Sequence, residues 1–182
     1  ELSNLALKAE TEIINATTTS GEGKEAVNDN NTGTYFSIIE DAPGDTVREV
    51  TYDKQPEIVM HYPVTGEFSQ MEWYSHGDFA GASVLEFEVS YYDLESGSFK
   101  QVTHSGGESI FVPALTGKML YDFDEPFETD QIKITLVKSR ASWSKSGMLA
   151  EIKTFGVWTG DMPPETPEKE TDDKLVATDF ET

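Results

Sequence analysis

Short segments in which every second residue is apolar constrain this chain most. The segments 84–91 and 131–136 both have this two-residue period, which is typical of strands with one buried face. The side chains that we expect to face a core are Leu85, Phe87, Val89, Tyr91, Ile132, Ile134 and Leu136. Further candidate strands are 57–62, 68–74, 118–123 and 149–158.

Turn-forming residues separate these segments. Gly, Pro, Asp and Ser cluster at 65–66, 76–78, 95–97, 105–107 and 124–126. No segment has a helical stripe of apolar residues over three turns, although residues 4–15 can form a short helix or an irregular edge strand. About eight short strands without intervening helices predict an all-β protein, an antiparallel β-sandwich or jelly roll.

The composition changes after Trp158. Residues 159–170 are rich in Pro and charged residues and poor in apolar ones, so burial cannot offset the entropy of ordering them. We therefore expect a folded module over residues 1–158 and an acidic, Pro-rich linker or tail over residues 159–182. A module inside a longer protein is the first interpretation, and a frayed natural C-terminus is the second.

Charge and cysteine content exclude several function classes. The chain has 34 acidic and 13 basic residues and a formal net charge of -21, which repels nucleic-acid phosphates and anionic lipid surfaces. The longest apolar runs fall far short of the roughly 20 residues that span a bilayer. Without cysteine there is no disulfide framework, thiolate zinc site or cysteine nucleophile. We expect no nucleic-acid partner and no membrane partner.

A turn rich in oxygen ligands lies near the N-terminus. Asp29, Asn31 and Thr34 supply side-chain oxygens within six residues, and Asn30 and Gly33 tolerate left-handed backbone. Calcium takes about 6 to 8 oxygen ligands, so such a turn and a distant Glu can close one cation site. The alternative is an Asn-rich turn with Asx-type bonds from side chain to backbone.

Four segments resemble the discoidin, or coagulation factor V/VIII type C, domains and their bacterial relatives, the family 32 carbohydrate-binding modules. Residues 29–36 resemble the D-G-N-x-x-T-x-W element of that family, and residues 4–6 resemble its opening N-L-A. Residues 149–156 resemble the closing L-A-E-I-x-x-x-G, and residues 87–102 resemble a central hairpin. The resemblance covers roughly residues 4–158 and departs from the family at Asn30, in place of Gly, and at Phe36, in place of Trp.

This resemblance implies an eight-stranded, galactose-binding-like jelly roll that agrees with the strand count. It also implies a structural Ca²⁺ whose ligands, transferred by position, are the side chains of Asp29 and Thr34, backbone carbonyls around Glu25, Ala26 and Asn31, and the Glu151 carboxylate.

Exposed aromatic side chains on end loops are the candidates for a sugar site, because sugars present apolar C–H faces and rings of hydroxyls. Trp143 is the first candidate, because it lies in a loop of Ser, Lys and Gly without apolar periodicity. The family also often places an aromatic in this loop; the alternative is an indole folded back as a lid. Trp73 alternates with Met71 on a strand and is expected in the core. The other candidate ligand-binding residues are His76, Phe79, Arg140 and Tyr74. The stretch 40–48 can shape the same rim.

The galactose-binding members commonly carry an Arg and an Asn in the loop that here reads 74–79, and both are missing. Specificity for galactose therefore does not transfer.

Together with the sequence pattern, the resemblance implies a noncatalytic, calcium-stabilised carbohydrate-binding module of a larger secreted, bacterial, glycan-active protein. Its expected partners are a glycan or glycoprotein and the neighbouring domains, its expected state is monomeric, and its expected location is extracellular or at the cell surface. The alternative is a protein-interaction, adhesion or spacer module with the same fold. We do not expect an enzyme, because G-x-S-x-G, H-E-x-x-H and phosphate-loop motifs are missing and the histidines are scattered.

Overall fold

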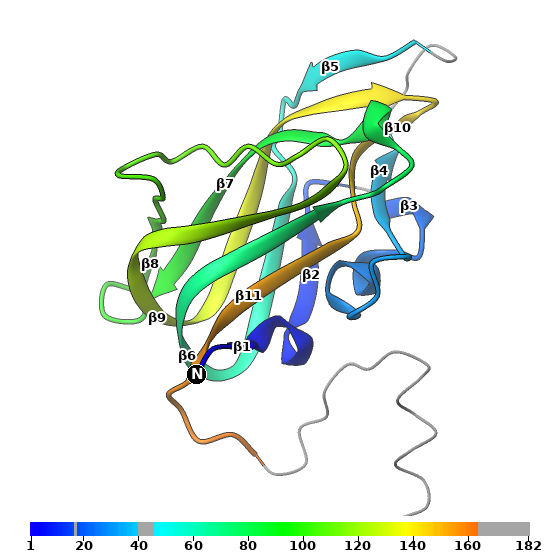
Figure 1. The fold of residues 1–182 in the computed structure, drawn as a ribbon. Helices are drawn as coiled ribbons and strands as arrows, with labels where there is room; N and C mark the ends of the chain where they lie inside the picture. The colour runs from blue at the N-terminus through cyan, green and yellow to red at the C-terminus, as the bar shows by residue number, and fades with distance from the viewer. Residues whose placement is uncertain (17, 40–45, 164–182) are drawn as a thin grey trace, which may run out of the picture.

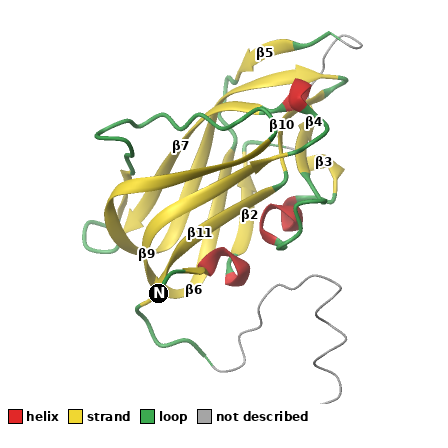
Figure 2. Ribbon diagram, in the orientation of Figure 1, coloured by secondary structure: helices red, strands yellow, loops and turns green. Residues whose placement is uncertain are grey.

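The structure, a computed structural model, describes residues 1–16, 18–39 and 46–163. Within these ranges it consists of strands and short 3₁₀ helices (Figures 1 and 2). No helix in the described ranges is long and apolar enough to cross a bilayer. In chain order the elements are β1 (Ser3–Asn4), η1 (Leu5–Lys8), β2 (Glu10–Ile14), β3 (Thr18–Gly21), η2 (Lys24–Asn28), β4 (Phe36–Ile39), β5 (Arg48–Thr51), β6 (Glu57–Ser75), η3 (Ala80–Ala82), β7 (Val84–Asp93), β8 (Ser98–Gln101), β9 (Gly117–Ser142), β10 (Lys145–Leu149) and β11 (Glu151–Trp158).

Two long strands, β6 and β9, run through both layers of a sandwich. The second half of β6 lies between the first half of β9 and β11, and β1 extends this layer beyond β11. The first half of β6 lies between the second half of β9 and β2, and β7 and β8 extend the other layer (Figure 1). These strand pairs are all antiparallel, which confirms the predicted antiparallel β-sandwich.

The prediction of turns at 65–66 and 124–126 is wrong, because both segments lie inside the long strands β6 and β9. The pairing register of β6 with β9 shifts near each of them, so the strands bend between the layers without reversing. A Cβ at Gly66 would lie 2.9 Å from the Leu5 Cδ1, so the buried Leu5 side chain would have to shift. The turns predicted at 76–78, 95–97 and 105–107 are confirmed.

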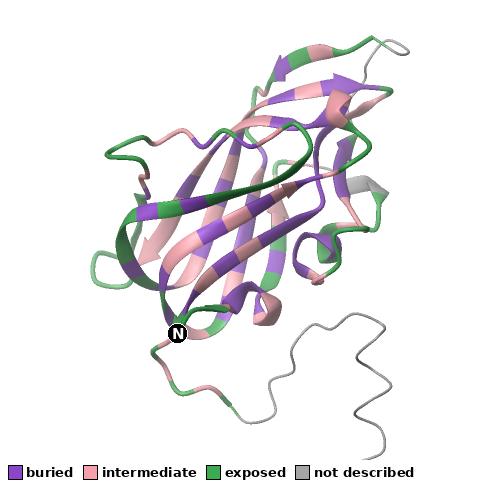
Figure 3. Cartoon of the chain, viewed as in Figure 1, coloured by how far each residue is buried: buried purple, intermediate pink, exposed green. Residues whose placement is uncertain are grey.

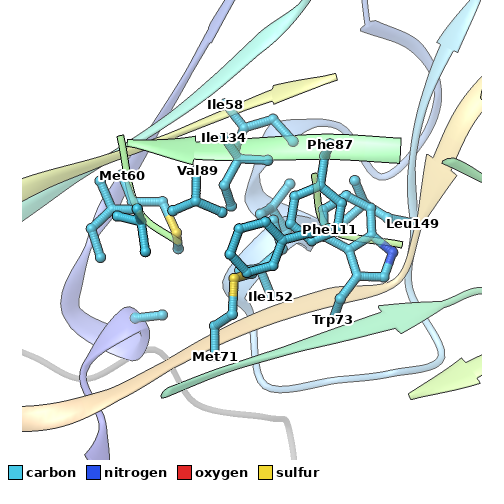
Figure 4. Close-up of a cluster of buried hydrophobic side chains, with 14 of the residues drawn as sticks. Ile58, Met60, Met71, Trp73, Phe87, Val89, Phe111, Ile134, Leu149 and Ile152 are labelled. Atoms are coloured by element: carbon cyan, nitrogen blue, oxygen red, sulfur yellow. The ribbon is translucent and has the colours of Figure 1, made fainter. Parts of the chain in front are cut away.

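Alternating side chains from both layers fill the core between them (Figure 4). Trp73 is fully buried, as predicted, and its ring stacks on Phe87 with 4.3 Å between the centroids. Leu85 was expected inside but is only half-buried, because register shifts between Val84 and Phe87 turn Val84 inward instead. The predicted inward residues that are buried are Phe87, Val89, Ile132, Ile134 and Leu136, whereas Tyr91 is half-buried against the core.

The N-terminal segment forms both of the structures considered for it, the helix η1 and the strand β2. The fully buried Asn28, at the end of η2, holds them in place. Its Nδ2 donates to the carbonyl oxygens of Ala6 (2.7 Å) and Ala9 (2.9 Å), and its Oδ1 accepts from the Thr11 hydroxyl (3.0 Å). These bonds anchor the oxygen-rich turn, which begins at the next residue.

Beyond β11 the backbone N–H groups of Thr159 and Gly160 both donate to the carbonyl oxygen of Thr65. Most of the predicted linker, residues 164–182, and most of the predicted rim stretch, residues 40–45, lie outside the described residues.

Candidate functional site

Trp143 lies at the tip of a two-residue hairpin at one end of the sandwich. β9 ends at Ser142 and β10 begins at Lys145, and these two residues pair. The two loop residues, Trp143 and Ser144, have φ values of 55° and 63°, the left-handed backbone that type I′ hairpins require and that Asn and Gly adopt best. A bulky side chain is strained there. Because the indole is 64% exposed, Trp143 is not a lid on the sandwich.

A surface pocket of about 280 Å³ adjoins the indole. The hairpin forms one wall and the η3 loop forms the other. Arg140 holds these walls together, since its backbone N–H donates to the Ser83 carbonyl and its Nη1 donates to the Ala80 carbonyl. The lining residues are Asp78, Phe79, Gly81, Ala82, Ser142, Trp143 and Lys145.

A cluster of aromatic rings continues from the pocket. The ring centroid of Phe79 lies 4.8 Å from that of His76 and 6.0 Å from that of Tyr35. The Lys145 ammonium lies 5.5 Å from the Phe79 ring and 5.9 Å from the Tyr35 ring. The Nδ1 of His76 accepts a hydrogen bond from the Asp78 backbone N–H (3.0 Å). In the neutral ring Nε2 therefore carries the proton and can donate.

Two of the sequence candidates lie elsewhere. Arg140 positions the η3 loop and does not line the pocket. Tyr74 lies on β6, where its hydroxyl donates to Glu72 Oε1 (3.1 Å) and the Lys153 ammonium lies 5.1 Å from its ring. The structure thus brings together Trp143, Phe79 and His76, and it adds Tyr35 and Lys145. Sequence reasoning missed these two because neither stands out by type, although Tyr35 directly follows the motif Thr34.

Substituting Trp143 with Asn is expected to raise the free energy of unfolding by about 1 kcal/mol, because Asn relieves the strain at this turn position. Denaturant unfolding measures the change. Ser144→Gly is the matched control, since it relieves strain in the same turn and keeps the indole. A Trp143→Asn protein less stable than wild type would mean that the indole packs on the sandwich after all.

The oxygen-rich turn lies between the end of η2 and the start of β4. Asp29 accepts two bonds, from the Asn31 N–H (3.0 Å) and from the Thr34 hydroxyl (2.6 Å). Asn30 has the expected left-handed backbone, with φ of 61°, whereas Gly33 is outside the left-handed region. The Gly33 N–H donates to Asn31 Oδ1 (2.9 Å). The turn therefore has Asx-type bonds, and its oxygens still converge around Asp29.

Glu151, at the start of β11, faces this turn from 121 residues away in sequence. It is fully buried, and its Oε2 accepts from the Asn30 N–H (2.9 Å). Its Oε1 has no hydrogen-bond partner among the described residues. Burial, and then the nearby Asp29 carboxylate, raise the pKa of Glu151 to about 8. A buried carboxylate oxygen without a donor, beside a second carboxylate, is costly and fits a bound cation.

The donor set is suited to a hard cation. Among the described residues no group of three or more His, Cys, Asp or Glu side chains could hold a metal. A cation here would bind two carboxylates, and neutral oxygens would complete its shell. Thr34 and the carbonyl of Asn31 lie in the same turn, and the exposed Glu25 and the buried Ala26 lie in the preceding η2.

The raised pKa of Glu151 predicts that the metal-free protein loses stability as the pH rises. An unfolded Glu titrates near 4.5 and the buried Glu151 near 8, so between these values the folded state holds the extra proton. The free energy of unfolding then falls with rising pH, by up to a few kcal/mol in total. Thermal melts in chelator from about pH 5 to about pH 8 test this. The slope should become smaller in Glu151→Gln, because the amide does not titrate; an equal slope in both proteins would contradict the assignment.

The other histidines have structural partners. His61 lies 2.8 Å from Glu12 across the β2–β6 pair, as expected of a cross-strand residue. His104 Nε2 donates to the Ile110 carbonyl (2.8 Å), and its ring packs on Phe111 with 4.1 Å between the centroids.

A scan against protein-family models finds no match, and a search of the curated proteins finds none either. The solved structures do match. The family 32 carbohydrate-binding module of Clostridium perfringens NanJ, in complex with galactose, has a TM-score of 0.61 and 11% identity, with 85% of this chain and 99% of that chain covered. The C. perfringens module CpGH89CBM32-5, in complex with GalNAc-β-1,3-galactose, has a TM-score of 0.60 and 9% identity, with 84% and 99% covered.

A third match lies within a larger protein. A putative α-L-fucosidase from Bacteroides thetaiotaomicron has a TM-score of 0.60 and 13% identity, with 86% of this chain but only 29% of that chain covered. This chain therefore has the discoidin-like β-sandwich fold of the family 32 carbohydrate-binding modules.

Proposed function

We propose that this chain is a noncatalytic carbohydrate-binding module whose sugar site is the pocket beside Trp143. One observation carries the proposal: an indole is held 64% exposed, on strained backbone, at the edge of a pocket. Strain of this kind concentrates at functional sites. The shared fold with carbohydrate-binding modules supports it.

The residues around the pocket supply the two kinds of contact that a sugar needs. Trp143 and Phe79 offer apolar surface to the C–H face of a pyranose ring. Lys145 and His76 Nε2 are donors, and the Asp78 carboxylate is an acceptor, for the hydroxyl groups. A shallow site with one stacking indole and few polar groups suits a terminal sugar or a short segment of a glycan rather than a fully enclosed ligand.

We further propose that the turn at Asp29 holds a structural Ca²⁺. The Asp29 and Glu151 carboxylates, the Thr34 hydroxyl and carbonyls around Asn31, Glu25 and Ala26 would hold it. The support is the buried Glu151 Oε1, to which no described residue donates a hydrogen bond. The cation would supply charge neutralisation, and it would tie the N-terminal turn to the last strand.

The proposed setting is extracellular, in or on a larger glycan-active protein, with residues 1–158 as a monomeric module and residues 159–182 as a linker. The match to a segment of a much longer α-L-fucosidase supports a modular setting. In it the module would hold an attached enzyme near its substrate and so raise the local substrate concentration.

An array of immobilised glycans, probed with the labelled full chain, tests the sugar proposal. We expect saturable binding to at least one glycan class, competed by the same free sugar. An array without any competed binding would overturn the proposal. Whether galactose-containing glycans bind is the most informative result. The Arg and Asn that galactose-binding members of the family commonly carry are missing from the loop 74–79.

A further inference from the structure

The first half of β9 is an open edge of the sandwich. Gly117–Asp122 pair with Ser75–Gln70 of β6 on one side. On the other side no described strand pairs with them, and the next bridge is at Phe123 (Figure 1). An open edge presents a row of unpaired N–H and C=O groups that can pair with another extended chain.

Charged side chains protect this open edge less than is usual. Natural proteins commonly place charged side chains on exposed edge strands. In this strand both charged side chains contact side chains of β6, and Asp122 also lines the groove beside the edge. The Lys118 ammonium lies 3.8 Å from Glu72, and Asp122 accepts a bond from Gln70 (2.6 Å). Between them lie Met119 and Leu120, which are 43% and 50% exposed. Most of this edge segment of β9 is coloured as exposed in Figure 3.

A groove runs along this edge. It has a volume of about 720 Å³ and lies between the β9 edge and the loop that precedes it. The loop is held in place, because the Tyr121 hydroxyl donates to the Val112 carbonyl (2.7 Å) and the Ser75 hydroxyl donates to the Ala114 carbonyl (2.6 Å). Val112, 55% exposed, adds a third apolar side chain to its lining.

The charges in the groove are of one sign. Of the described residues, Glu108, Asp122 and Asp124 line it, and no described Lys or Arg does. The Gly106 N–H, followed by the Thr103 hydroxyl, holds the pKa of Asp124 below its ordinary value, so that this carboxylate stays ionised. With a net charge of -21, a second copy of this chain would be repelled, whereas a basic partner would be attracted.

We infer that the β9 edge and its groove form a docking site for an extended, basic peptide segment of a partner protein. The segment adds a strand beside Gly117–Asp122, its apolar side chains contact Met119, Leu120 and Val112, and its Lys or Arg side chains face the groove carboxylates. This site is separate from the Trp143 pocket and does not depend on sugar binding.

The test uses the full chain and an acetylated, amidated heptapeptide of alternating Lys and Val. Fluorescence anisotropy measures affinity, and amide hydrogen exchange locates the contact. We expect saturable binding with new protection at residues 117–122. A control peptide with alternate backbone amides N-methylated keeps the charge but loses the donors, so we expect it to bind about tenfold more weakly or less.

Matched protein variants complete the design. Leu120→Thr keeps charge and strand propensity and should weaken binding several-fold, whereas Val157→Thr, at a 41% exposed site on β11, should not. Equal binding of the N-methylated peptide, protection outside residues 117–122, or no binding would overturn the inference. The inference would also be overturned if, without peptide, protection of these amides increased with protein concentration. A second copy of the chain would then cover the edge.

Discussion

Replacing Trp143 with alanine is expected to weaken glycan binding at least about thirtyfold, or roughly 2 kcal/mol, as truncation of a binding hot spot does. The indole is the largest apolar surface at the pocket, and it contributes little to the core because it is 64% exposed. The Tm should therefore stay the same or rise. Isothermal titration with the best glycan from the array measures the affinity.

Phe99→Ala is the matched control, because Phe99 is also an exposed aromatic, on β8 away from the pocket. It should bind the glycan as well as wild type. If Trp143→Ala retains full affinity, the sugar site lies elsewhere on the module. If both variants lose affinity together with stability, the loss reports unfolding and the Tm identifies it.

Removing calcium is expected to lower stability by about 2.7 kcal/mol relative to protein with free calcium at about 100 times its Kd, because the cation binds only the folded state. For a domain of this size that is on the order of 5–10 °C in Tm. Thermal melts in chelator and in excess Ca²⁺ measure the difference. Magnesium at the same concentration is the control for ionic strength.

Glu151→Gln separates a cation site from an ordinary buried carboxylate. The amide removes the charge that burial and Asp29 disfavour, so in chelator at about pH 8 the variant should be at least as stable as wild type. Calcium should then no longer raise its Tm. If calcium stabilises Glu151→Gln as much as wild type, or stabilises neither protein, the cation does not bind between Asp29 and Glu151.

The alternating apolar pattern predicted the layers of the fold but not the path of the chain. Ile132, Ile134 and Leu136 face the core because a strand with regular pairing keeps its period. At Val84 the register shifts, so the period breaks and Leu85 turns outward. Such shifts depend on the partner strand, which the local sequence does not contain. For the same reason the Gly and Pro residues inside β6 and β9 were predicted as turns.

The candidate site could be predicted only in part. An exposed Trp143 followed from a loop without apolar periodicity, and the turn at Asp29 followed from its oxygen-rich residues. Tyr35 joins the site from a turn that is distant in sequence. Lys145 joins it because it pairs with Ser142 at the base of the Trp143 hairpin, and its residue type alone did not mark it. Arg140 was a reasonable hydrogen-bond donor by type, but the tertiary structure directs its guanidinium to the Ala80 carbonyl.

The most direct test of the central claim follows the three indole N–H signals by NMR during titration with the glycan that binds best. The signal of the exposed Trp143 should shift in proportion to the bound fraction, while that of the fully buried Trp73 should stay in place. Saturable binding that leaves the Trp143 signal unmoved would contradict a sugar site at this pocket, and so would the failure of every glycan to bind.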